Sequence, residues 1–141
     1  KIQHKYLFYY PLEKNKFWIS ARFGMRLNTH KNKYEMHHGV DFAAPKGTPI
    51  KAALNGFVER VDNDAKGFGN YVIINHANDC KTRYAHMSKV IVKKGEYVET
   101  GAIVGLVGST GNTRGKRNGA HLHFEVIING KRCNPLPYLI W

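Results

Sequence analysis

Five of the eight histidines in this sequence fall in three short segments whose residue types and spacing could do chemistry. In His121-Leu122-His123-Phe124-Glu125, polar and apolar residues alternate as in a β-strand, so the two histidines and the glutamate share one face. The other face is expected to pack in the core: Leu122, Phe124 and Val126. Two imidazoles on one strand face can reach a single metal ion, one as ligand and one beside the bound water. The alternative is a polar strand face with two solvated histidines, and this segment alone does not decide.

The second segment, His37-His38-Gly39-Val40-Asp41, offers an imidazole and a carboxylate four residues apart. Gly39-Val40 and the following Pro45 argue against a helix and favour an extended turn around Gly39. Zinc binds both ligand types at roughly 2.0–2.2 Å, and a catalytic zinc site typically has three protein ligands and a bound water. His37, Asp41 and one histidine of the first segment would complete such a site. His38 is a rival for His37 that spacing alone does not exclude.

The third segment is Tyr84-Ala85-His86. In a strand, Tyr84 and His86 would point the same way and Ala85 would point into the packing. His86 is a candidate general base or transition-state stabiliser, with a purely structural histidine as the alternative. The remaining three histidines lack such a context and are expected at the surface or in structural roles: His4, His30 and His76.

The elements that must position these segments are predicted to be short strands, so the fold class is all-β. Asn129-Gly130 is a strong hairpin signal because both residues tolerate positive φ. Residues 1–16 are expected to form an N-terminal lead-in segment with a strand from Tyr6 to Tyr10, and residues 17–141 a single domain. The predicted core strands are Ile50–Ala53, Phe57–Val61, Asn70–Asn75, Cys80–His86, Ile103–Val107 and His121–Ile128.

Composition narrows the class of protein. The chain has 141 residues, 43% of them hydrophobic, which suits one globular domain, and it contains no apolar run near 18 residues that would predict a membrane span. It begins at Lys1 without an apolar signal core, so we expect a mature or truncated fragment. The net charge of +12 favours polyanionic partners. No nucleic-acid partner is expected, since RNA-recognition, zinc-finger and helix-turn-helix signatures are absent.

The only two cysteines, Cys80 and Cys133, form no CxxC pair, which makes a cysteine zinc site improbable. Whether they pair in a disulfide or remain separate thiols is left open by the sequence.

Together the three segments resemble the lysostaphin-type (LytM-like) peptidoglycan endopeptidases. Further stretches are similar to the family in the same order, and the resemblance covers about Phe17 to Leu139. The stretches are Ile19–Arg26, His38–Pro49, Gly69–Ile74, Lys94-Gly95 and Gly108–Gly111.

This resemblance implies a compact, mainly antiparallel β-sheet core with a substrate groove, and one zinc ion (Zn2+) held by His37, Asp41 and His123. It implies that His86 and His121 are the catalytic histidines. The sequence lacks the HExxH helix whose Glu serves as base in other zinc proteases, so a histidine must do that work, and His121 is placed for it. Tyr84 and Glu125 are expected to support the site at most indirectly.

The implied partner is peptidoglycan, and the implied location is the bacterial cell envelope, either periplasmic or secreted. Two cross-links are candidate substrates, the bond from D-Ala to meso-diaminopimelate and an oligoglycine bridge, and the resemblance favours the first. The alternative function is a catalytically inactive LytM-like module that binds the wall and activates an amidase. Such modules usually lose zinc ligands, whereas this chain retains the expected set.

One segment departs from the family pattern. Residues 112–120 form a longer and strongly basic loop that ends in Ala120, where members typically have Pro. The loop is expected either to change the shape of the groove or to be a tolerated surface insertion.

Overall fold

The computed structural model describes residues 6–29, 31–113 and 119–141. Within these ranges every regular element is a β-strand except one short 3-10 helix, so the all-β prediction is confirmed. None of the described residues forms a helix long and apolar enough to cross a membrane. The elements are β1 (Phe8–Tyr9), β2 (Trp18–Ala21), β3 (Gly24–Asn28), β4 (Lys33–His37), β5 (Val40–Ala43), β6 (Pro49–Lys51), β7 (Gly56–Asp64), β8 (Gly69–Asn75), β9 (Cys80–Val90), β10 (Tyr97–Val98), β11 (Ile103–Val107), β12 (His121–Ile128), β13 (Lys131–Cys133), η1 (Leu136–Tyr138) and β14 (Leu139–Ile140).

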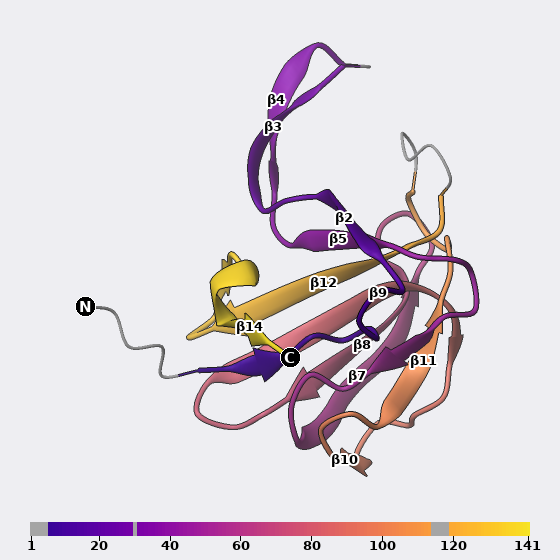
Figure 1. Cartoon of the computed structure of the whole chain (residues 1–141), viewed down its shortest axis with the longest axis vertical. Helices are drawn as coiled ribbons and strands as arrows, with labels where there is room; N and C mark the ends of the chain where they lie inside the picture. Colours follow the sequence, from indigo (N-terminus) through magenta and orange to yellow (C-terminus); the bar gives the residue numbers. More distant parts are fainter. Residues whose placement is uncertain (1–5, 30, 114–118) are drawn as a thin grey trace.

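The main sheet has ten strands, and its pairings are antiparallel (Figure 1). Its central order is β10-β7-β8-β9-β12-β5-β2, with β11 joined to β6 and β9, and β13 joined to β12. The predicted hairpin at Asn129-Gly130 is confirmed, because β12 and β13 pair across it and both residues have positive φ. This order places β5 and β9 on either side of β12, so the three histidine segments meet in the middle of the sheet.

The core lies against one face of this sheet. Leu122, Phe124 and Val126 of β12 are fully buried in it, as their alternation predicted. The histidines of β12 therefore lie on the opposite face, and the core side chains hold that face in place. Cys80 is buried in the core and Cys133 is partly exposed, and both are free thiols in the structure.

The N-terminal segment contributes to the same core. The predicted strand from Tyr6 to Tyr10 is present in shorter form as β1, which pairs in parallel with β14. Phe8 and Leu12 are almost completely buried in the main cluster. The boundary between residues 1–16 and residues 17–141 stays a prediction.

Strands β3 and β4 form a hairpin that stands away from the main sheet (Figure 1). The register pairs Arg26 with Glu35 and Gly24 with His37, so these four positions share one face. The other face carries the exposed apolar pairs Met25–Met36 and Leu27–Tyr34. The hairpin ends at His37, directly before the short segment that leads into β5.

Candidate metal centre and active-site cleft

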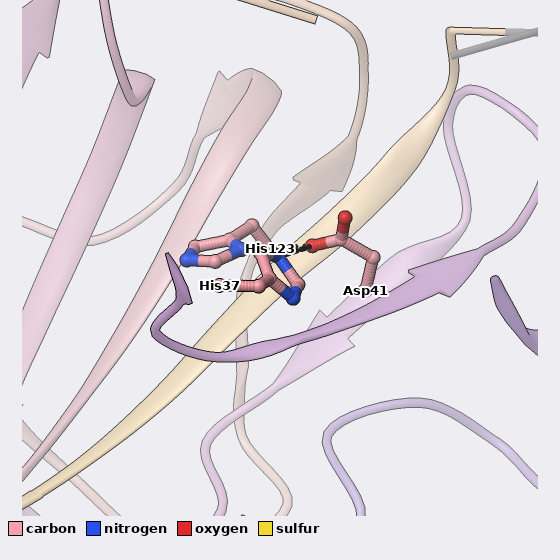
Figure 2. A group of neighbouring side chains, drawn as sticks. All are labelled: His37, Asp41 and His123. Carbon is pink, nitrogen blue, oxygen red and sulfur yellow. Dashed lines mark hydrogen bonds and ion pairs between the residues drawn. The ribbon is translucent and has the colours of Figure 1, made fainter. Parts of the chain in front are cut away.

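Three of the predicted site residues lie together on the side of the sheet opposite the core. His37 at the end of β4, Asp41 in β5 and His123 in β12 point toward one another (Figure 2). Asp41 Oδ1 lies 2.8 Å from His123 Nδ1 and 3.2 Å from His37 Nε2. One ligand atom from each side chain lies within 4.8 Å of the others, close enough for a single metal ion to be held by all three.

The sheet register brings these residues together. Asp41 lies directly opposite His123 in the β5–β12 pair, so their side chains emerge from the same face. Gly39 lets the chain pass close behind His123, since a Cβ there would lie 2.5 Å from the carbonyl oxygen of Phe124 and 2.9 Å from His123 Cε1. The predicted extended turn at Gly39 is present. Glycine is needed there because any side chain would collide with the neighbouring strand β12.

Hydrogen bonds from the outer edges of the two rings determine which nitrogen faces inward. His37 Nδ1 lies 2.9 Å from the carbonyl oxygen of Arg22, which can only accept, so Nδ1 carries the hydrogen. His123 Nε2 lies 2.8 Å from Glu125 Oε2 and donates to this carboxylate. In the neutral rings, His37 Nε2 and His123 Nδ1 are therefore the atoms with lone pairs, and both face the carboxylate of Asp41. Three electron-pair donors in one place call for a cation between them, which is the donor set of a metal site.

The electrostatics of this group agree with its need for a cation. Burial alone would raise the pKa of Asp41, but hydrogen bonds from His123 and His37 outweigh burial and hold that pKa well below its usual range. Burial would lower the pKa of His123, but its bonds to Asp41 and Glu125 raise it to about 9.

The two predicted catalytic histidines lie beside this group. His121 Nε2 is 4.0 Å from Asp41 Oδ2, and the rings of His121 and His86 are 4.8 Å apart between centroids. His121 Nδ1 donates to the carbonyl oxygen of Gly119, and His86 Nδ1 donates to that of Thr110, both at 2.8 Å. With Nδ1 engaged in this way, Nε2 is the ring atom that can accept a proton. Burial lowers the pKa of His86 to about 4, which keeps this ring neutral near pH 7.

The prediction that Tyr84 and His86 point the same way is wrong. Tyr84 lies opposite Val72 and Met87 opposite Asn70, so β9 contains one residue more than β8 over this stretch. Such a bulge reverses the alternation of side chains. His86 is the residue with positive φ, at 65°, and it lines the cleft, whereas Tyr84 is fully buried in the core.

The predicted groove is present as a cleft of about 700 Å3 around these side chains. Loop residues at its side include Gly67, Phe68 and Asn112, and the β3–β4 hairpin contributes Arg26, Asn28, Lys31 and Glu35. The basic part of the loop 112–120 lies outside the described residues between 114 and 118. The three side chains of the metal group belong to the lining of this cleft.

Other sequence expectations have different outcomes. His38 belongs neither to the metal group nor to the cleft lining, so the structure brings His37 rather than His38 to Asp41. His76 has a structural place, bonded to Asn55 and Thr82, and His4 and His30 lie outside the described residues. Glu125 was expected to support the site at most indirectly, and its contact with His123 was not predicted from the sequence. Its position two residues after His123 on the same strand face was the available signal.

Comparison with known proteins agrees with this geometry. The model of peptidase family M23 matches residues 35–135. The chain is 41% identical over 128 residues to the peptidoglycan DD-endopeptidase ShyA of Vibrio cholerae, which covers 90% of this chain and 28% of ShyA. It spans about a quarter of the length of the curated relatives it matches.

Among solved structures, a zinc containing peptidase from Vibrio cholerae superimposes with a TM-score of 0.83 and 35% identity, covering 92% of this chain and 39% of that one. The catalytic domain of lysostaphin from Staphylococcus simulans gives a TM-score of 0.75 and 32% identity, covering 88% and 92%. The expected likeness to lysostaphin-type enzymes is confirmed. Because the family model covers most of the chain, including all three side chains of the metal group, the chain belongs to peptidase family M23.

Proposed function

We propose that this chain is a zinc-dependent endopeptidase that hydrolyses peptide cross-links of bacterial peptidoglycan at the cell envelope, in the periplasm or outside the cell. The observation that carries the proposal is the convergence of His37 Nε2, Asp41 Oδ1 and His123 Nδ1 in an open cleft. Two imidazoles and one carboxylate are a typical protein ligand set of a catalytic zinc site with one open position. When bound there, zinc would polarise a carbonyl and make a bound water acidic.

Each neighbouring residue then has a defined task. His37, Asp41 and His123 hold the metal. His121 accepts the proton of the attacking water at Nε2, because its Nδ1 hydrogen is engaged by Gly119. His86, held in the same tautomer by Thr110, accepts the second proton of that water at Nε2 and delivers it to the departing amine, while His121 releases the first proton to solvent. This assignment favours proton transfer by His86 over oxyanion stabilisation, since a neutral His86 has no free N–H for an oxyanion.

We further propose the D-Ala to meso-diaminopimelate bond as the preferred cross-link. The carbon next to the amide nitrogen of this bond carries a carboxylate. Arg26 lines the cleft from the same hairpin face as His37. Its cross-strand neighbour Glu35 is bonded to Asn28 and Lys31 instead, and Arg26 makes no ion pair with the residues that the structure describes. A cation at this place suits a substrate carboxylate beside the scissile bond.

The experiment is metal analysis combined with digestion of purified peptidoglycan. The protein as isolated should carry about one zinc ion per chain. A chelator should abolish release of cross-link products, and added zinc should restore it, while circular dichroism shows that the chelated protein remains folded. Full cleavage by metal-free protein would contradict the proposal. Binding to the wall without cleavage by zinc-loaded protein would instead support the inactive, amidase-activating module.

A further inference from the structure

Glu125 is the most deeply placed acidic side chain beside the metal group. It is 1% exposed, and its Oε2 lies 2.8 Å from His123 Nε2. An ionised carboxylate only accepts hydrogen bonds, so this contact puts the ring hydrogen on Nε2 and leaves the lone pair on Nδ1. Nδ1 is the atom that faces Asp41. The contact therefore determines both the tautomer of His123 and the direction of its ligand atom.

A buried carboxylate needs a partner to stay ionised and in place, and Arg83 supplies it. Arg83 lies directly opposite Glu125 in the β9–β12 pair, and its Nη1 is 2.7 Å from Glu125 Oε1. The two oxygens of Glu125 thus have separate partners, one the arginine and the other the histidine. Arg132 is more distant, at 3.7 Å from Oε2, and its side chain is 39% exposed.

Phe68 contacts both ends of this series of contacts, because its side chain touches Arg83 as well as His123. The guanidinium carbon of Arg83 lies 4.3 Å from the centre of the Phe68 ring. The same ring also stacks on the imidazole of His123, at 5.9 Å between centroids with 29° between the planes. The carbonyl oxygen of Phe68 also accepts a hydrogen bond of 2.7 Å from the backbone N–H of His86. The arginine is therefore held from the same loop that fixes the backbone of His86.

We propose that Glu125 and Arg83 are positioning residues that hold His123 with Nδ1 toward the metal. Phe68, packed against both Arg83 and His123, keeps these two side chains in place. The inference rests on the proposed role of His123 as a metal ligand. Partners of this kind behind a ligating histidine typically change metal affinity by about 10–100-fold. The chain would then use three side chains, from β9, β12 and the loop before β8, to orient one ligand.

The test is zinc affinity, measured by competition with a chromogenic chelator on purified folded protein. Glu125→Gln keeps the shape but loses the charge, and should weaken zinc binding by about 10–100-fold. Arg83→Met should also weaken zinc binding. The zinc affinity of the double variant should be close to that of the single variant that binds zinc more weakly, because both residues act through one contact. Arg132→Met is the matched control, and its affinity should stay within about twofold of the original chain.

A second measurement separates orientation of the ligand from general stability. With Co2+ in place of zinc, the visible absorption spectrum reports on the coordination of the ion, and it should change in Glu125→Gln but not in Arg132→Met. Thermal unfolding of the metal-free proteins gives the purely structural cost. If Glu125→Gln fails to fold because Arg83 loses its counter-ion, the double variant removes both charges and takes its place.

The outcomes are distinct. Unchanged zinc affinity and an unchanged Co2+ spectrum in the folded variants, with normal zinc binding by the original chain, would overturn the positioning role and leave the proposed function standing. Absence of zinc binding in the original chain would overturn the proposed function, and this inference with it. A large loss of stability without a loss of zinc affinity would assign Glu125 and Arg83 to the fold alone.

Discussion

Asp41 and His123 lie directly opposite each other in the β5–β12 ladder, and 2.8 Å separates Oδ1 from Nδ1. They are 82 residues apart in the sequence, so the ladder register alone sets this distance. A slip by one residue would move each side chain to the opposite face of the sheet. The apolar side chains on the core face of β12 prevent such a slip, which is how the packed core maintains the geometry of the metal group.

The absence of a side chain at Gly39 should matter for metal binding. In Gly39→Ala the new Cβ would press on the Phe124 carbonyl and on His123 Cε1, at 2.5 and 2.9 Å. We expect zinc affinity to fall at least tenfold and stability to fall by about 1–3 kcal/mol, the usual cost of overpacking. Zinc competition and urea unfolding measure the two effects.

Gly130→Ala is the control for this substitution. Gly130 lies in the β12–β13 turn with a φ of +79°, so alanine there costs stability by backbone strain, but no atom near a new Cβ belongs to the site. Its zinc affinity should be that of the original chain. Normal zinc affinity in Gly39→Ala would contradict the close-approach explanation.

The buried neutral state of His86 predicts a pH dependence of stability. Burial lowers the pKa of His86 from 6.5 to about 4. Between these values the unfolded chain binds a proton that the folded chain does not, so stability is lost as the pH falls through 6.5 toward 4. From pH 7.5 to pH 5, the metal-free original chain should lose about 2 kcal/mol more than His86→Gln.

Urea unfolding of both metal-free proteins at the two pH values checks this difference. Glutamine can still donate a hydrogen bond to the carbonyl of Thr110, so the variant differs mainly in the titration. Equal losses in the two proteins would show that His86 is not held neutral by burial.

Arg26 should select the substrate by charge. Two synthetic cross-linked peptides suffice, one with meso-diaminopimelate and one with lysine, which lacks the carboxylate beside the amide nitrogen. Arg26→Gln should lower kcat/KM for the diaminopimelate peptide about tenfold and leave the lysine peptide nearly unchanged. Lys33→Gln is the matched control, since Lys33 belongs to the same hairpin but does not line the cleft. Equal decreases on both peptides would contradict carboxylate recognition by Arg26.

Short sequence patterns were sufficient to predict the elements that depend on neighbouring residues alone. The alternation from His121 to Val126 predicted both faces of β12, and Asn129-Gly130 predicted the following hairpin. The selection of His37 and His123 as ligands came from the family resemblance. The structure brings both histidines together with Asp41, and their role as ligands stays a prediction.

The missed features depend on pairing between distant strands. The bulge that turns His86 toward the cleft results from unequal residue numbers in β8 and β9, which neither strand reveals alone. Arg83 resembles any exposed strand residue until β12 places Glu125 opposite it. The β3–β4 hairpin was also missed, because its apolar face is exposed and gives no signal of burial in a core.

The most direct test of the metal assignment compares His121 and His123, which are the same residue type on the same strand face. Zinc content and cross-link cleavage should be measured on the same preparations of His121→Ala, His123→Ala and the original chain. His123→Ala removes one of three ligands, so zinc and activity should both be lost. His121→Ala should retain about one zinc per chain while turnover falls by roughly 10²–10⁴. Loss of zinc in His121→Ala together with its retention in His123→Ala would show that the ligand and the base are interchanged, and would contradict the site proposed for this chain.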